Sequence, residues 1–377
     1  MNRKILALLL ITLLIFTATA CGKKDSSSTS GGKELGFKIG LVTGTVSQGE
    51  EEFRAGENAV EKYGKDVIKH VTYPDKFTQE QETTIAQITG LASDPEVKAI
   101  IVLQAVPGTA AAFDKIKEDR DDILFIAGVP HEDPETIVPR ADIILETDNI
   151  KRGETIVRLA KDMGAKTFVH YSFPRHMSYE LLAQRRDVMK KTANELGLEF
   201  VTLDAPDPTG DAGISGAQQF MIEDVPRQVD KYGKDTAFFN TNCSMQEPLI
   251  KSVIETGAIY PEQCCPSPYH ALPGALGLQI PEEKAGDVDF ILEEIGTKIG
   301  ELDASGRVAT WKVPANMAMV DAAIEYAVAY GKGDVEKFNK DKMVEILKTV
   351  TDDPNISVNE LEDAPNFLMF VTESQIF

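Results

Sequence analysis

The sequence contains no signature of a familiar enzyme. It has no Gly-x-Ser-x-Gly elbow, no phosphate-binding Walker loop and no His-Glu-x-x-His zinc motif. Basic residues are also scarce, since 39 Lys and Arg stand against 60 Asp and Glu and the formal net charge is −21. Such a surface repels nucleic acids and anionic lipid headgroups, so neither is expected as a partner. Because the enzyme motifs are missing, we expect a protein that is not an enzyme and carries no cofactor.

Long hydrophobic runs are equally scarce. The run from Ile5 to Phe16 is shorter than the roughly 20 residues that a membrane-spanning helix needs. It follows a basic start and precedes small residues and Cys21, which predicts a secretory signal over residues 1–20. A cysteine at this position resembles the lipobox of bacterial lipoproteins, and this resemblance implies an acylated, palmitate-bearing Cys21 on the outer side of the cell membrane. An ordinary signal peptide with an incidental Cys21 is the alternative; residues 21–36 read as a flexible Gly/Ser-rich tether.

Cysteine is also rare, with only four in the chain. Besides Cys21, these are Cys243, Cys264 and Cys265, and no second Cys or His pair stands at the spacing of a zinc site, so no metal is expected. Cys243 follows one predicted strand and the vicinal pair lies on the next. Neighbouring strands are ~4.8 Å apart, and disulfides persist outside the cytoplasm. We therefore predict a disulfide from Cys243 to Cys264 or Cys265, with three reduced thiols as the alternative.

From Phe37 onward, short apolar strands alternate with helical segments. Strands that are apolar throughout and separated by helices indicate βαβ units and parallel sheets covered on both faces. The same rhythm restarts near Lys166, and 377 residues exceed what a single core usually holds. The sequence therefore predicts an α/β protein with two Rossmann-like lobes. The main strands are expected at 37–42, 67–73, 99–103, 123–127, 141–146, 166–171, 199–203 and 236–240.

Three stretches carry a resemblance to a known family. They are the opening strand and loop at 38–45, the Asp-Asn stretch at 148–154 and the strand end at 238–245. With the lipoprotein-like start, they make the chain resemble the type I periplasmic binding proteins, in the ribose/galactose-binding and nucleoside-lipoprotein group. The resemblance implies two lobes joined by a multi-crossover hinge, with a ligand cleft between them. The chain departs from the family at Cys243 and Cys264-Cys265, where acidic residues that clamp sugars are expected.

The resemblance also implies a division of the chain into lobes. A hinge built from several crossovers requires the chain to return, so the N-terminal lobe is predicted at 37–147 plus 312–334. The C-terminal lobe is predicted at 148–311 plus the last strand, 365–377. Residues 335–364 are expected to form a C-terminal extension.

The candidate binding residues follow from strand order. In open parallel sheets, ligands bind beyond the carboxyl ends of the strands. Trp311, the one tryptophan, could instead act as a stacking plate or pack between the lobes. Asp148 could simply cap a helix, and the Arg185-Arg186 pair is read as solvated. The predicted ligand-binding residues are Thr45, Ser47, Gln48, Gln104, His131, Asp148, Arg175, His176, Asn242, Tyr269 and Trp311.

Taken together, the resemblance implies an extracytoplasmic solute-binding lipoprotein. Its expected ligand is a small polar organic molecule, a sugar or a nucleoside-like compound, and its expected partner is the permease of an ABC importer. The chain is expected to be a monomer that contacts the membrane only through lipid. A ligand sensor of the same fold that signals to a membrane receptor is the main alternative, and a secreted enzyme is the weaker one.

Overall fold

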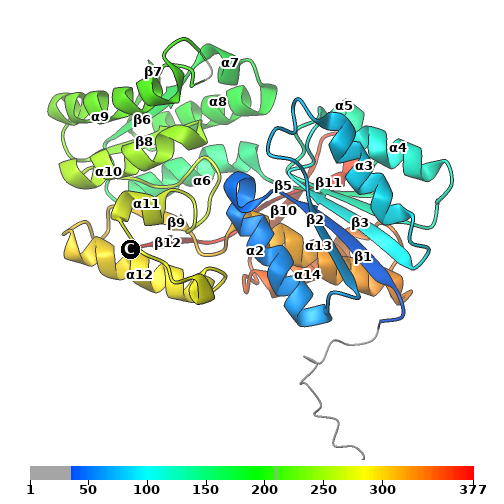
Figure 1. Cartoon of the computed structure of the whole chain (residues 1–377). Helices are drawn as coiled ribbons and strands as arrows, with labels where there is room; N and C mark the ends of the chain where they lie inside the picture. Colours follow the sequence, from blue (N-terminus) through cyan, green and yellow to red (C-terminus); the bar gives the residue numbers. More distant parts are fainter. Residues whose placement is uncertain (1–34, 209) are drawn as a thin grey trace, which may run out of the picture.

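The computed structural model describes residues 35–208 and 210–377. Cys21, the predicted signal and nearly all of the predicted tether lie outside the described residues. The described chain forms two α/β lobes that lie side by side (Figure 1). One lobe combines the start and the end of the chain, and the other is built from its middle.

The first lobe is organised around a seven-stranded sheet with the order β10-β11-β5-β4-β3-β1-β2. All neighbours pair in parallel except β10 and β11, which are antiparallel. The interior strand β3 is buried along nearly its whole length, as expected for a parallel sheet covered on both faces. The strands are β1 (Lys38–Thr43), β2 (Ile68–Thr72), β3 (Val97–Leu103), β4 (Leu124–Gly128), β5 (Ile143–Thr147), β10 (Ser357–Leu361) and β11 (Ala364–Val371).

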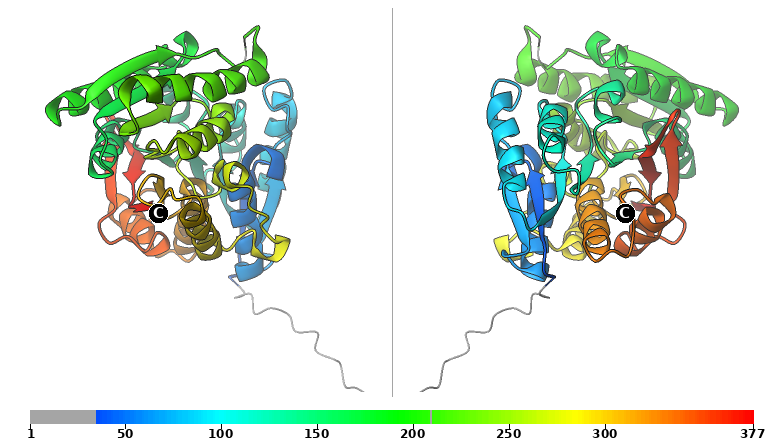
Figure 2. Two further views of the ribbon diagram at one scale, coloured as in Figure 1. Left: turned by 90° about the vertical axis from the view of Figure 1, so that its left-hand side faces the viewer. Right: turned by 90° about the vertical axis from the view of Figure 1, so that its right-hand side faces the viewer.

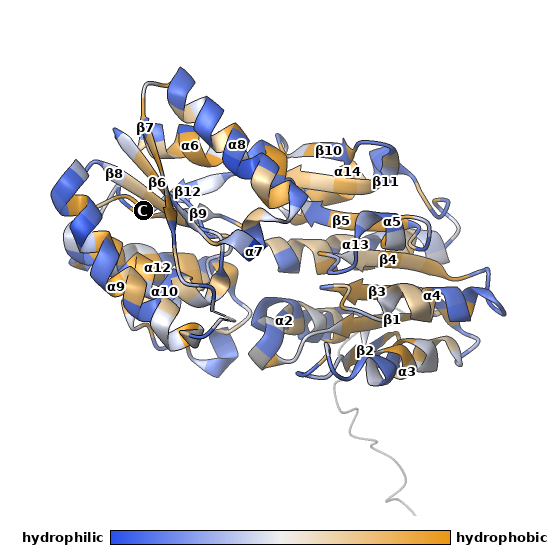
Figure 3. Cartoon of the chain, turned by 90° about the horizontal axis from the view of Figure 1, so that it is seen from above, coloured by the Kyte–Doolittle hydropathy of each residue, from blue (hydrophilic) through white to orange (hydrophobic). Residues whose placement is uncertain are grey.

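Helices cover both faces of this sheet and form two apolar cores. One core lies under helices that come from both ends of the chain: α2 (Val46–Tyr63), α13 (Ala315–Gly331) and α14 (Lys340–Val350). The other lies under α3 (Gln81–Ala92), α4 (Thr109–Lys117) and α5 (Pro134–Ile137). Seen from above, the apolar strands lie between helices whose outer faces are hydrophilic (Figure 3).

The second lobe has a smaller parallel sheet with the order β7-β6-β8. Its strands are β6 (Thr167–Ser172), β7 (Glu199–Asp204) and β8 (Thr236–Asn240). One core packs α6 (Asn149–Asp162) and α8 (Glu180–Glu195), and the other packs the remaining large helices. The further helices are α7 (Pro174–Met177), α9 (Gly213–Tyr232), η1 (Cys243–Met245), α10 (Gln246–Thr256), α11 (Leu272–Leu276), η2 (Glu282–Lys284) and α12 (Val288–Glu301).

The chain passes between the lobes three times. It crosses from β5 to α6, from β9 (Ala309–Trp311) to α13, and from β11 to β12 (Ser374–Ile376), which pairs antiparallel with β9. In the two side views the last strands, coloured red, lie beside the orange helices of the first lobe (Figure 2).

The last crossover corrects two predictions. The prediction that the last strand, 365–377, belongs to the C-terminal lobe is wrong for β11, which pairs in parallel with β5 in the first sheet. Its buried Leu368 and Phe370 complete the core of that lobe. The predicted C-terminal extension, 335–364, is also part of that lobe, because α14 packs on α13 and β10 forms the sheet edge.

Within 35–208 and 210–377, no helix combines the length and the hydrophobicity needed to cross a membrane.

Candidate ligand-binding cleft

A cleft of about 350 Å³ lies between the two lobes. Residues at the carboxyl ends of strands of both sheets line it: Thr147 at the end of β5 and Asn149 after it, and Thr241, Asn242 and Cys243 after β8. This is the position at which open parallel sheets bind ligands, and the volume suits a small organic molecule. A larger hollow of about 930 Å³ borders the edge strand β2, but it is lined by the first lobe alone. The cleft between the lobes is therefore the candidate site.

Arg185 is the main cationic group of the cleft wall. It extends from α8, and only 2% of its surface is exposed. Its Nη1 donates to Asn149 Oδ1 at 2.7 Å, and its guanidinium carbon lies 5.0 Å from the Phe239 ring centroid. Its Nε is buried without a hydrogen-bond partner among the described residues, and burial lowers its pKa to about 10. The prediction that Arg185 is solvated is therefore wrong, because helix α8 turns this side chain into the cleft.

Two carboxyl groups line the same cleft as Arg185. Burial raises the pKa of Glu51, on α2, to about 8 and that of Glu146, at the end of β5, to about 7. Glu146 also accepts hydrogen bonds from the Thr147 N–H at 2.7 Å and the Thr147 hydroxyl at 3.1 Å, which partly offset the burial. Both carboxyls thus titrate near neutral pH, so the cleft can present either charged or hydrogen-bond-donating groups.

Behind the cleft, Glu52 holds the loops of the first lobe in place. Its carboxylate is fully buried and accepts from the Gly44 N–H at 2.6 Å and from Gln104 Nε2 at 3.0 Å. It also accepts from Asn316 Nδ2 at 3.1 Å and from the Tyr73 hydroxyl at 3.2 Å. These bonds tie β1, β3 and α13 together at their cleft-facing ends. Burial raises the pKa of Glu52 above its ordinary range.

A buried ion pair occupies the hinge. Arg152, on α6, donates from Nε to Glu262 Oε1 at 2.8 Å, and both side chains are almost completely buried. Its Nη2 donates to the Gln263 carbonyl at 2.8 Å. Trp311 donates from Nε1 to the other Glu262 oxygen at 2.8 Å, and its ring is wholly buried in the core of the first lobe. Trp311 therefore packs between the lobes and offers no face to a ligand.

Of the eleven predicted binding residues, His176 and Asn242 line the cleft. His176 Nδ1 lies 3.1 Å from Thr241 Oγ1, and burial lowers its pKa to about 4, so it is neutral at neutral pH. Asn242 Oδ1 accepts from the Ser244 N–H at 3.0 Å and caps η1. Tyr269 packs against the cores of both lobes, and its hydroxyl has no partner among the described residues.

Five further predicted residues make contacts outside the cleft lining. Thr45 and Gln48 both bond to Asp75, at 2.6 and 3.0 Å, while Gln104 is held by Glu52. His131 is exposed and its ring lies 5.7 Å from that of Phe77. Arg175 forms a two-point ion pair with Asp207, at 2.8 and 2.9 Å.

Asp148 serves as a helix cap and an anchor. Its Oδ1 accepts from the Lys151 N–H at 2.8 Å, and its Oδ2 accepts from Asn359 Nδ2 at 2.7 Å. It is 3% exposed, so both oxygens are committed to the protein. The side chain of Ser47, the remaining prediction, lies outside what the structure describes.

The cysteines meet at the second-lobe wall of the cleft. Cys243 Sγ lies 3.2 Å from Cys264 Sγ and 3.5 Å from Cys265 Sγ, and the vicinal pair is separated by 3.9 Å. All three thiols are free. The predicted proximity is present, but the predicted disulfide is not formed in this structure. Residues 263–266, predicted as a strand, are irregular.

Sequence reasoning missed several cleft residues. Arg185, Glu51 and Glu146 sit on helices or at a strand end, where side chains of this kind are ordinarily solvated. Asn149 is part of the Asp-Asn stretch at 148–154 that carries the family resemblance, so the sequence did contain a pattern from which its place in the cleft could be predicted. The other three become cleft residues only through the packing of one lobe against the other.

The fold and cleft define the class of protein. A substrate-binding protein of a sugar ABC transport system from Bordetella parapertussis 12822 superposes with a TM-score of 0.53 at 12% identity, over 90% of this chain and 88% of that protein. A sugar ABC transporter protein from Actinomyces odontolyticus gives 0.53 at 9% identity, over 81% and 86%. The chain therefore has the type I periplasmic binding protein fold, as the resemblance implied.

The family described as "Protein of unknown function (DUF3798)" matches residues 37–309, and the chain belongs to this family. A Clostridium difficile 630 protein described as a candidate transcriptional regulator has a TM-score of 0.81 at 28% identity, over 90% of this chain and 99% of that protein. Two uncharacterized proteins of Treponema pallidum (strain Nichols) are 39% and 41% identical over 198 and 169 residues. These matches span 50% and 45% of this chain and 90% and 78% of the relatives.

Proposed function

We propose that this protein is an extracytoplasmic solute-binding lipoprotein that captures a small polar organic ligand in the cleft between its lobes and delivers it to an ABC importer. The observation that carries the proposal is the cleft itself, with Arg185 buried in its wall and one guanidinium nitrogen unpartnered among the described residues. A buried donor without an acceptor is costly. A ligand oxygen would supply the missing acceptor, so the ligand is expected to carry an anionic or electron-rich oxygen, as sugars and nucleoside-like compounds do.

The hinge supports capture by lobe closure. Three crossovers join the lobes, and the cleft walls come from both of them. Closure of two lobes around a ligand is a hinge motion at such crossovers. Such closure would bring Glu51 and Asn316 of the first lobe toward His176 and Arg185 of the second, burying the ligand between donors and acceptors.

The binding test uses full-length protein. We expect a small molecule to co-purify and to be released unchanged on denaturation, as detected by mass spectrometry. Arg185→Met should weaken rebinding of that molecule by at least ~10-fold, the effect of losing about 1.5–3 kcal/mol from a charged hydrogen bond. Arg186→Met is the matched control, because the neighbouring guanidinium pairs with Asp187 at 2.7 Å and does not line the cleft. Equal affinities for the two variants would contradict the proposed role of Arg185.

The lipid anchor has its own test. The lipoprotein-like start motivates the proposal that Cys21 carries the acyl chains and is the membrane attachment. Cys21→Ser should leave an uncleaved or shed protein. Membrane retention of this variant at the wild-type level, with no acyl mass on Cys21 of the wild type, would overturn the anchor while leaving the binding function intact.

Sensing is the second candidate function. The Clostridium difficile protein, 28% identical, is described as a candidate transcriptional regulator, and this description favours a regulatory role for the same fold. Uptake of the co-purified molecule separates the two roles. A deletion strain that loses uptake supports transport, whereas one that keeps uptake but no longer responds to the molecule supports sensing.

A further inference from the structure

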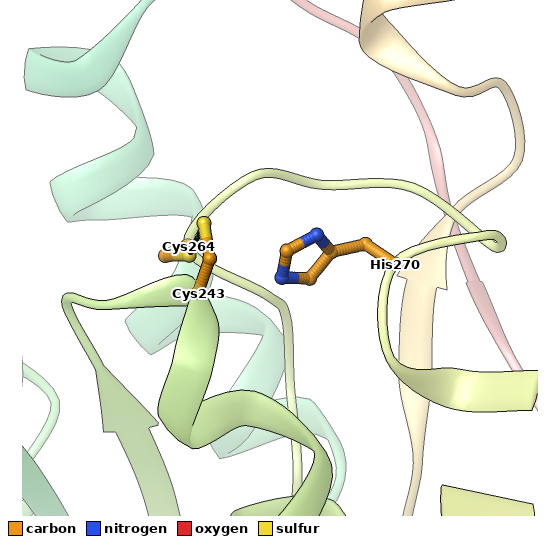
Figure 4. Close-up of side chains that lie close together, drawn as sticks. All are labelled: Cys243, Cys264 and His270. Atoms are coloured by element: carbon orange, nitrogen blue, oxygen red, sulfur yellow. Dashed lines mark hydrogen bonds between the residues drawn. The ribbon is translucent and has the colours of Figure 1, made fainter. Parts of the chain in front are cut away.

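Three ligand atoms that could hold one metal ion meet at the second-lobe wall of the cleft, from Cys243, Cys264 and His270, and the Cys265 sulfur lies beside the other two sulfurs. Cys243 begins η1, directly after β8, and Cys264 and Cys265 lie on the irregular segment that follows β8 and α10. The His270 ring comes from a third position, just before α11, and points at the two cysteines drawn with it (Figure 4). One of its nitrogens lies within 4.8 Å of both Cys243 Sγ and Cys264 Sγ. We refer to these four residues as the thiol–imidazole cluster.

The sulfur spacing matches a metal ligand set. Sulfurs bonded to one tetrahedral zinc ion at ~2.3 Å are about 3.8 Å apart. The three Sγ–Sγ distances here are 3.2, 3.5 and 3.9 Å. A disulfide would use two sulfurs at about 2.05 Å, and would leave the third sulfur and the imidazole without a role. The approach of all three sulfurs and a histidine is explained better by a shared ion.

A second observation concerns His270. Its Nε2 is buried and has no hydrogen-bond partner among the described residues. A buried imidazole nitrogen without a partner needs an explanation, and a histidine that ligates a metal commonly donates its other N–H to a neighbour. The Nε2 atom is therefore available to an ion, since no described group of the protein bonds to it.

The surroundings suit a cation held by thiolates. Cys243, Cys264 and Cys265 all line the cleft, and Cys243 and Cys265 are exposed, so an ion can enter from solvent. Three thiolates around a divalent ion leave one net negative charge. The guanidinium of Arg185 lines the same cleft and interacts electrostatically with Cys264 and Cys265, which would balance that charge.

We propose that Cys243, Cys264, Cys265 and His270 form a Cys₃His site for a zinc-class metal ion. Mixed thiolate and imidazole ligands in a tetrahedral set favour Zn²⁺ over the oxygen-seeking cations Mg²⁺ and Ca²⁺. The ion enters as the divalent cation, and the thiol protons leave to solvent as the thiolates bind it. The inference goes beyond the proposed function, because it concerns an ion bound by the protein itself and its test uses no organic ligand.

The test uses full-length protein, reduced and kept without oxygen, with Zn²⁺ and Co²⁺ as probes. We expect one ion per chain by elemental analysis, and a Co²⁺ spectrum with thiolate charge-transfer bands. Cys264→Ser and His270→Ala should each weaken Zn²⁺ binding by more than the roughly 10–100-fold that loss of a supporting partner costs. His131→Ala is the matched control, since that histidine is also on a loop but is outside the cluster.

A second measurement does not depend on the variants' folding. Bound Zn²⁺ should protect Cys243, Cys264 and Cys265 of the wild type from alkylation, and a chelator should restore reaction at all three, as read by peptide mapping. Absence of thiolate bands, equal Zn²⁺ affinity of Cys264→Ser and wild type, or a Cys243–Cys264 disulfide in protein isolated without reductant would each overturn the proposal. None of these results bears on whether an organic ligand binds Arg185.

Discussion

Arg152→Met is the sharpest test of how the hinge is stabilised. The substitution keeps an unbranched side chain of similar length but removes the charge that faces Glu262. Both partners are almost completely buried, at 0% and 2% side-chain exposure. The carboxylate would keep only the Trp311 N–H as a described side-chain donor, and the Gln263 carbonyl would lose its partner.

The magnitude follows from the burial. Breaking a buried ion pair on one side typically costs about 3–5 kcal/mol, since it leaves an uncompensated charge. The two short Arg152 bonds, both 2.8 Å, place this pair within that range. The double variant Arg152→Met/Glu262→Gln should recover at least about half of the loss, because the glutamine oxygen can still accept from Trp311 and no buried charge remains.

Urea unfolding followed by intrinsic fluorescence is the assay. Trp311 is the only tryptophan of the chain, so its emission reports on the hinge itself. Lys166→Met is the control, because its ion pair with Asp235, at 2.8 Å, is solvent-exposed and such pairs are worth only ~0–1 kcal/mol. A loss below about 1 kcal/mol for Arg152→Met, or a double variant no more stable than the single one, would refute the reasoning.

Three further expectations concern the cleft and its supports. Glu52→Gln should destabilise the protein by about 1–3 kcal/mol in urea unfolding, because it removes a buried carboxylate that accepts hydrogen bonds from four donors; an unchanged midpoint would contradict that role. Because burial raises the pKa of Glu51 to about 8 and of Glu146 to about 7, the folded state holds these protons more tightly than the unfolded chain, so their stabilising contribution is lost as pH rises through those values. Glu146→Gln should therefore gain stability relative to wild type as the pH rises from about 4.5 to about 7, and a difference independent of pH would count against the assignment. Asp148→Ala should cost about 1 kcal/mol or more in thermal unfolding, since it removes the cap of α6 and the partner of Asn359, whereas wild-type stability would show that the cap is dispensable.

The sequence by itself determined the architecture. Apolar strands such as 99–103 and 123–127 alternate with helices, and this local periodicity reports which segments are buried on both faces of a parallel sheet. The positions of the loops after the strands also follow from local pattern, so His176 and Asn242 could be predicted at the cleft. Strand periodicity does not, however, say which sheet a strand joins. Strand β11 is apolar enough for either, and only its pairing with β5 assigned it to the first lobe.

Tertiary structure alone decided the chemistry of the cleft. Arg185 became a buried donor because α8 packs against α6 and turns that face inward. Trp311 can be buried in the core because its indole N–H donates a hydrogen bond to Glu262, 49 residues away in sequence. The thiol–imidazole cluster has no recognisable motif spacing, since Cys243 follows β8 whereas Cys264, Cys265 and His270 lie on the segment between α10 and α11. Motif spacing in a sequence identifies metal ligands that share one local element. The thiol–imidazole cluster, by contrast, forms only when β8, α10 and α11 are packed together.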